Sequence, residues 1–131
     1  GDGRTAFVDV RDVAAAAALA LADPPAHAGR AYELTARDAL TYDEVAAALG
    51  AAVGRPIRYA RPGPLAFWRA RRALGEPRGF VLVMEALYAT ARLGLAAHVS
   101  PELEALLGRP PIDVHRFARD HADVWRPTPP A

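Results

Sequence analysis

The spacing of apolar positions along the chain predicts mostly helices. An alanine-rich segment over 13–22 follows Asp12, a residue type well suited to cap a helix N-terminus. Thr41 and Glu44 form a capping box at the start of a second helix. The apolar residues of this second helix recur at helical spacing as far as Gly54: Val45, Ala48, Leu49 and Ala52. Both segments therefore begin at a side chain that can satisfy free backbone N–H groups.

The second half of the chain predicts further helices. Pro64 can start one that continues through Leu74. The most apolar segment, 79–95, suits a helix better than a strand because of its length. Asp113 can cap the last helix, whose apolar stripe is expected to be buried: Val114, Phe117, Ala118, His121, Val124 and Trp125.

Three short runs of β-branched and aromatic residues predict strands, over 5–10, 31–35 and 57–60. A proline-rich tail over 126–131 is expected to be disordered, which leaves a single domain over 1–125. The fold class is therefore α/β and α-rich, with about three short strands and five helices. Three such strands make a poor free-standing sheet, so the pattern indicates part of a larger fold.

Composition excludes several kinds of site. The 131 residues contain no cysteine, which rules out disulfides, thiolate metal sites and a cysteine nucleophile. All 16 basic residues are arginine, so neither a lysine Schiff base nor a Tyr–Lys catalytic pair can form within this chain. No apolar run has the length of a membrane span and no signal peptide opens the chain, so we expect a cytoplasmic protein. Because it begins at Gly1 without methionine, a fragment of a longer protein is also expected.

Basic residues are concentrated in one stretch. Between Arg55 and Arg92 there are eight arginines and two acids, Glu76 and Glu85. Such a stretch can bind phosphates, but the net charge of +1 and the thin aromatic interleaving argue against a nucleic-acid partner. A solvated helix face explains the arginines more simply.

Neither a metal site nor a catalytic triad is indicated. The four histidines have no metal-ligand spacing, and His115 and His121 face different sides of a helix. Ser100 precedes Pro101 as a helix cap, without the glycines that surround a nucleophilic serine. We therefore predict no metal, and the catalytic residues stay unassigned.

Three blocks in order resemble the C-terminal half of NmrA-like proteins, the atypical branch of the short-chain dehydrogenase/reductase superfamily. The first block is GDGRTAFVDVRDVA at 1–14. The second is AYELTARDALTYDEVAAALGAAVGRPIRY at 31–59, and the third is ELEALLGRPPIDVHRFARDHADVW at 102–125. The blocks cover nearly the whole chain, which makes the resemblance specific.

The resemblance implies an intact protein that binds NAD(P) and either transfers hydride or senses the cofactor. The family's cofactor signature is a glycine-rich loop after the first strand, but here Gly1 and Gly3 precede that strand. We therefore expect the substrate-side portion of an NAD(P)-dependent oxidoreductase or redox sensor, with no dinucleotide site and no activity of its own. The alternative is a stand-alone module that binds a small ligand or a protein.

Two groups of residues are candidates for the substrate side. Asp9, Arg11 and Asp12 lie at the turn that faces the cofactor–substrate cleft in the family, although helix capping by Asp12 and an ion pair of Arg11 explain them better. The second group contains Glu85, Tyr88 and Arg92 on one helix face, together with two aromatic residues nearby in the sequence, Phe67 and Trp68. These five could line a substrate pocket. The simpler interpretations are a partly exposed Glu–Arg stripe for the first three and inward-packing aromatics for the other two.

The sequence also predicts that the chain associates with itself. Strands and an apolar helix that would pack on a larger sheet in the intact family are left uncovered here. We therefore expect a homo-oligomer, in the form of a symmetric dimer.

Overall fold

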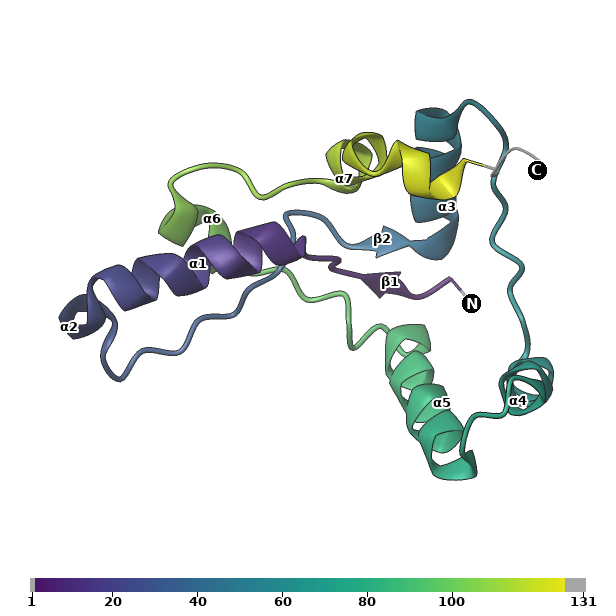
Figure 1. The fold of residues 1–131 in the computed structure, drawn as a ribbon. Coiled ribbons are helices and arrows are strands. Elements are labelled where there is room, and N and C mark those ends of the chain that lie inside the picture. The colour runs from purple at the N-terminus through teal and green to yellow at the C-terminus, as the bar shows by residue number, and fades with distance from the viewer. Residues whose placement is uncertain (1, 127–131) are drawn as a thin grey trace.

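The computed structural model describes residues 2–126, and these residues form an α-rich α/β fold (Figure 1). The fold class predicted from the sequence is thus confirmed. The elements follow one another as β1 (Arg4–Thr5), α1 (Val10–Ala22), α2 (Pro24–His27), β2 (Leu40–Thr41), α3 (Tyr42–Val53), α4 (Pro64–Ala73), α5 (Arg78–Arg92), α6 (Glu102–Leu107), α7 (Val114–Asp120) and the 3-10 helix η1 (Ala122–Trp125). Beyond Arg126, the predicted tail lies outside the described residues.

The helices form where local capping signals predict them. In α3 the Thr41 hydroxyl accepts a hydrogen bond from the Glu44 amide at 3.2 Å, and the Glu44 carboxylate accepts one from the Thr41 amide at 2.7 Å. Gly54 ends this helix in the left-handed region, with φ of 73°. The Asp113 carboxylate caps α7 by accepting from the Arg116 amide at 2.7 Å. The capping box at Thr41 and the Asp113 cap are therefore confirmed. The predicted Ser100 cap is wrong, because α6 begins at Glu102 with Pro101 as its N-cap, although the Ser100 hydroxyl accepts a hydrogen bond from the Glu102 amide at 3.2 Å.

The start of α1 was predicted wrongly. The helix begins at Val10, three residues early, because Asp9 and not Asp12 is its N-cap. The Asp9 carboxylate accepts a hydrogen bond from the Arg11 amide at 2.8 Å. Asp12 lies in the first turn, where its side chain is fully buried and bonds elsewhere in the chain.

The predicted strands differ more from the structure than the predicted helices do. Of the three, only the first overlaps a strand, and β1 pairs antiparallel with β2, in the register Arg4 with Thr41 and Thr5 with Leu40. The segments 31–35 and 57–60 are not strands. In the segment 31–35, hydrogen bonds that involve side chains take the place of a neighbouring strand. The Glu33 amide donates to the Glu102 carboxylate at 2.5 Å, and the Thr35 hydroxyl donates to the Ser100 carbonyl oxygen and accepts from the Ser100 amide. Polar backbone groups satisfied in this way need no neighbouring strand.

The end of the chain also departs from the helical pattern. Ala118 is buried as predicted, but Val124 and Trp125 are exposed, Val124 by 72%. The α-helix ends at Asp120 and continues as η1, whose tighter winding rotates later residues out of the predicted stripe.

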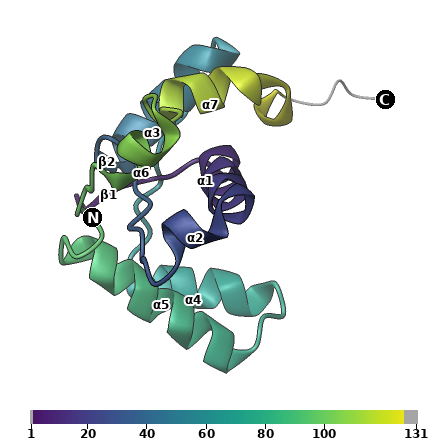
Figure 2. The same cartoon turned by 90° about the vertical axis from the view of Figure 1, so that its left-hand side faces the viewer.

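The elements gather in three groups. Helices α4 and α5 pack together, α3 packs with α7 and η1, and α1 packs with α2 and α6 (Figures 1 and 2). The small sheet lies between the α3 group and α5, which contacts β1. The buried core is small and rich in alanine, with Leu103 and Val81 as its largest apolar members. None of the helices described between residues 2 and 126 is both long and apolar enough to cross a bilayer.

Candidate functional site

A cavity of about 160 Å³ lies where the α4–α5 pair meets the small sheet and the start of α3. Its wall comes from five separate parts of the chain: the N-terminal segment, α3, the loop before α4, α4 itself and α5. The lining residues are Gly3, Tyr42, Tyr59, Pro62, Phe67, Glu85, Tyr88, Ala91 and Arg92.

Aromatic rings make up much of this wall. Tyr42 and Tyr59 stack with ring centroids 5.1 Å apart and an interplanar angle of 25°. Phe67 and Tyr88 meet edge to face at 5.2 Å, which joins α4 to α5. Phe7 supports Tyr42 from behind, again edge to face, at 5.5 Å. Edge-to-face and offset pairs are the arrangements that aromatic quadrupoles favour, so these rings hold one another in place.

The Tyr42 phenol is held in its protonated form. Burial raises its pKa above the usual value, and the neighbouring phenols of Tyr88 and Tyr59 raise it further. The hydroxyl therefore remains a hydrogen-bond donor well above neutral pH. It gives the cavity one polar group that does not change with physiological pH.

Glu85 contributes a carboxylate whose bonding is incomplete. Its Oε1 is shut off from solvent and has no hydrogen-bond partner among the described residues. Arg92, seven residues later, forms no ion pair with it among those residues; its Nη2 donates to the Pro62 carbonyl oxygen at 3.4 Å. Glu85 is half-buried and Arg92 is exposed, as the simpler interpretation of a partly exposed stripe expected.

Gly3 brings the N-terminal segment unusually close to α5. A Cβ atom at this position would lie 2.0 Å from the Ala91 carbonyl oxygen and 2.6 Å from its carbon. Real Cβ atoms cannot approach a backbone so closely, so this contact requires glycine. Because Ala91 and Arg92 also line the cavity, the contact positions that side of the wall.

The loop that carries Tyr59 and Pro62 is tied to α3. Arg61 has a φ of 48°, in the left-handed region that residues with a side chain seldom adopt. Its guanidinium forms an ion pair with Asp43 and another with Asp2 at 3.5 Å. These ion pairs join the loop to the N-terminal segment and to α3, next to the stacked rings of Tyr59 and Tyr42.

The predicted residues divide between two places. Phe67, Glu85, Tyr88 and Arg92 meet at the cavity, while Trp68 is half-buried and does not line it. Sequence reasoning missed the lining residues contributed by other segments, Tyr42 and Tyr59 above all. Both lie within the resemblance block over 31–59, which was the one signal that could have drawn attention to them.

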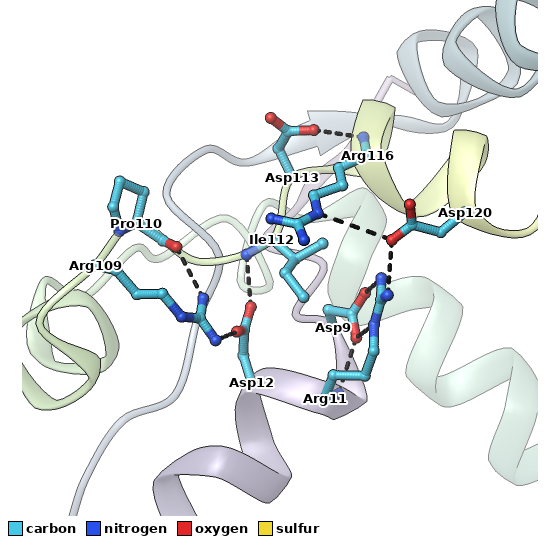
Figure 3. A network of polar contacts seen from close by, with 9 residues as sticks. All are labelled: Asp9, Arg11, Asp12, Arg109, Pro110, Ile112, Asp113, Arg116 and Asp120. Atoms are coloured by element: carbon cyan, nitrogen blue, oxygen red, sulfur yellow. Dashed lines mark hydrogen bonds and ion pairs between the residues drawn. The ribbon is translucent and has the colours of Figure 1, made fainter.

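Asp9 and Arg11 take part in a polar network away from the cavity wall (Figure 3). Arg11 reaches Asp9 at 2.8 Å and Asp120 of α7 at 2.7 Å. Hydrogen bonds from Arg11 lower the pKa of both carboxyl groups, and these bonds raise the pKa of the guanidinium in turn. The predicted ion pair of Arg11 is present, and it ties the start of α1 to α7.

Asp12 forms the second half of this network (Figure 3). Its Oδ1 accepts from Arg109 at 2.7 Å, and its Oδ2 accepts from the Ile112 amide at 2.6 Å. The carboxylate is fully buried, whereas the Arg109 side chain is 46% exposed. Asp12 thus connects α1 to the loop between α6 and α7.

A dinucleotide does not fit the N-terminus of α1, although the family resemblance places this helix start at the cofactor–substrate cleft. A pyrophosphate needs free N–H groups and a positive potential at a helix N-terminus. Here the Asp9 carboxylate already caps the helix and Asp12 adds a second negative charge in the first turn. No glycine-rich loop joins β1 to α1.

Most arginines of the basic stretch are bound within the protein. Arg55 donates to the Trp125 carbonyl oxygen at 3.1 Å, Arg72 to that of Glu76, and Arg71 pairs with the Glu76 carboxylate at 2.5 Å. Arg61 and Arg92 are engaged as described above. Among residues 2–126, no group of three or more His, Asp or Glu side chains is gathered in a way that could hold a metal ion.

Comparison with known proteins gives relatives over almost the full chain, although no family model matches. The chain is 38% identical over 125 residues to an NAD(P)H azoreductase of Xenophilus azovorans, covering 95% of this chain and 43% of that protein. It is 37% identical over 130 residues to a (4-alkanoyl-5-oxo-2,5-dihydrofuran-3-yl)methyl phosphate reductase of Streptomyces griseus subsp. griseus, covering 97% of this chain and 44% of the relative.

A solved structure also matches almost the full length of this chain. The crystal structure of an NADPH-dependent quinone oxidoreductase from Escherichia coli superimposes with a TM-score of 0.80 at 27% identity, over 96% of this chain and 44% of the other. The chain thus spans less than half the length of the curated relatives it matches, and it matches their C-terminal part. The names of the azoreductase and of the quinone oxidoreductase state NAD(P)H or NADPH as the cofactor, and the third relative is named as a reductase. The chain belongs to the NmrA-like, atypical branch of the short-chain dehydrogenase/reductase family and corresponds to the C-terminal part of its members.

Proposed function

We propose that this chain is the substrate-binding part of an NAD(P)H-dependent reductase, and that the aromatic cavity is the substrate site. The observation that carries the proposal is the meeting of Tyr42, Tyr59, Phe67 and Tyr88 around one cavity that also holds the Glu85 carboxylate. Ligand sites are typically hollows of this kind, mostly apolar with a few polar groups that set orientation.

The chemistry of the wall favours a small conjugated substrate. Rings at these positions offer faces and edges against which a planar ligand can pack. The cavity of about 160 Å³ suits one or two fused rings. The names of two relatives refer to azo compounds and quinones, which are planar conjugated groups. The dinucleotide would be bound by a part of the intact protein outside these 131 residues, because the start of α1 does not fit it.

Ligand titration tests the proposal. Menadione, a two-ring quinone, is expected to bind the chain, and Ala91→Leu, which adds three carbons to the cavity wall, is expected to weaken that binding at least about tenfold. Ala89→Leu is the matched control, because Ala89 is an exposed alanine of α5 that does not line the cavity. Isothermal titration calorimetry measures the menadione affinity of each variant, and saturation-transfer NMR identifies the menadione protons that contact the protein.

The same titration with NADPH is expected to show no binding by the isolated chain. Two results would contradict the proposal. One is menadione binding that is equal in the wild type and in Ala91→Leu, and the other is no menadione binding at all. A low-micromolar dissociation constant for NADPH would show that the chain contains a dinucleotide site after all.

In isolation the chain is also proposed to form a symmetric dimer. The small sheet contributes little edge, since each strand has only two residues. Exposed apolar side chains contribute more: Leu82, Val83 and Leu87 on α5 are 59–63% exposed, and Val10 and Leu21 on α1 exceed 70%. Apolar surface left uncovered in this way favours association.

Light scattering behind a sizing column measures the assembly. We expect a mass of about twice 14.0 kDa at tens of micromolar, and a shift to the monomer when Leu82 and Leu87 are both replaced by glutamate. A monomeric wild type with cooperative unfolding would contradict the dimer and show that the chain covers its own core.

A further inference from the structure

We propose that Glu85 selects, among planar ligands of the aromatic cavity, those that carry an N–H or O–H donor. This inference rests on the proposed function, since it assigns a substrate class to the same site. The substrate would be a small aromatic or conjugated molecule with a hydroxyl, amino or amide N–H group placed to reach the carboxylate.

The first argument is the incomplete bonding of this side chain. Glu85 Oε1 is one of two buried side-chain oxygen or nitrogen atoms without a hydrogen-bond partner in the described part of the chain, and the other is the Thr5 hydroxyl oxygen. Leaving a carboxylate oxygen without water or a donor is costly, so native proteins nearly always provide a partner. Glu85 also lies on the wall of a cavity, where a ligand can be that partner.

The second argument is that the nearby cations are used elsewhere. Among the lining residues, Arg92 is the one cation, and its guanidinium donates to the Pro62 carbonyl oxygen. Arg71, on the neighbouring helix α4, pairs with Glu76 at 2.5 Å and also lies over the Phe67 ring. The carboxylate therefore has capacity for a donor from outside the protein.

The third argument is selectivity by repulsion. A carboxylate only accepts hydrogen bonds, so an ether or carbonyl oxygen brought to the same place would face its lone pairs. Menadione, which has carbonyl oxygens and no donor, is therefore expected to bind through its rings alone and more weakly than a hydroxylated ring system. The last torsion of a glutamate side chain is soft, so the carboxylate can turn toward a donor at small energetic cost. A site built to bond a donor discriminates strongly against the analogue that lacks it.

β-Naphthol and its methyl ether test this inference, because they share the ring system and differ in one O–H donor. The wild-type chain is expected to bind the naphthol at least about tenfold more tightly than the ether. In Glu85→Gln the preference should fall below about twofold, since an amide can donate to the ether as well as accept from the hydroxyl. Glu85→Leu, which offers no polar atom, should bind the two probes equally.

Glu104→Gln is the matched control, because Glu104 lies on α6 and does not line the cavity. It should keep the wild-type preference. Calorimetry gives the affinities, and circular dichroism melting shows that each variant is folded at the temperature used.

The outcomes separate the two proposals. If the wild type binds both probes equally and Glu85→Gln changes neither, the inference about Glu85 is overturned while the aromatic site stands. If the wild type binds neither probe nor menadione, the substrate site itself is overturned and the inference falls with it. A preference for the naphthol that persists in Glu85→Leu would assign the donor contact to another residue and overturn the inference alone.

Discussion

Asp12→Ala is expected to lower the free energy of unfolding by about 3 kcal/mol. The substitution removes two charge-assisted hydrogen bonds, to Arg109 at 2.7 Å and to the Ile112 amide at 2.6 Å. Arg109 is half exposed and can return to water, so its share of the loss is moderate. The part-buried Ile112 amide loses its acceptor, and a fully buried donor left unpaired would cost about 1–3 kcal/mol, which sets the upper limit of this contribution.

Urea denaturation followed by tryptophan fluorescence measures this effect. Asp38→Ala serves as the control, because Asp38 is exposed and changes at such positions stay within about 0.5 kcal/mol. A loss below about 1 kcal/mol for Asp12→Ala would mean that the link between α1 and the α6–α7 loop contributes little to stability.

Gly3→Ala is expected both to destabilise the fold and to impair the cavity. The new methyl group would meet the Ala91 carbonyl oxygen at 2.0 Å, so β1 or the C-terminal end of α5 has to move. Overpacking of this kind typically costs about 1–3 kcal/mol. Because Gly3, Ala91 and Arg92 line the cavity together, menadione binding should weaken about tenfold or more at a temperature where the variant is still folded.

Gly79→Ala is the matched control for this substitution. Gly79 lies in the first turn of α5, and a Cβ atom there would meet nothing within 4 Å. Alanine at such a helical position should leave binding unchanged and raise the free energy of unfolding by about 0.4–1 kcal/mol. Equal behaviour of the two variants in calorimetry and urea denaturation would contradict the role given to the Gly3 contact.

The polar network around the start of α1 shows how far a helix start can be predicted from the sequence. Asp9, Arg11 and Asp12 were expected at a helix start, and they are there. Asp12 was predicted to be the cap, and this was wrong: both aspartates are good caps, they are three residues apart, and Asp9 is the N-cap. The choice depends on Arg109 and Ile112, about a hundred residues away, which occupy the Asp12 carboxylate.

The positions of the strands likewise could not be predicted from local sequence. The run over 57–60 has the composition of a strand, yet the structure has none there, while β2 forms at Leu40–Thr41 without a strong local signal. A strand exists only when a partner lies beside it, and its partner is decided by how the rest of the chain packs. Here β1 and β2 are 35 residues apart along the chain and still pair.

By itself, the sequence determined the family and most of the helices, although not the start of α1 or the short helix α2. Helix hydrogen bonds join residues four apart, so capping residues such as Thr41 and Asp113, together with apolar spacing, carry enough local information. Only the tertiary structure decided the cavity, because its wall joins Gly3, Tyr42, Tyr59, Phe67 and Glu85 from separate segments. Ring stacking, the close approach of Gly3 to α5 and an unpartnered carboxylate are properties of packed surfaces, which no local pattern specifies.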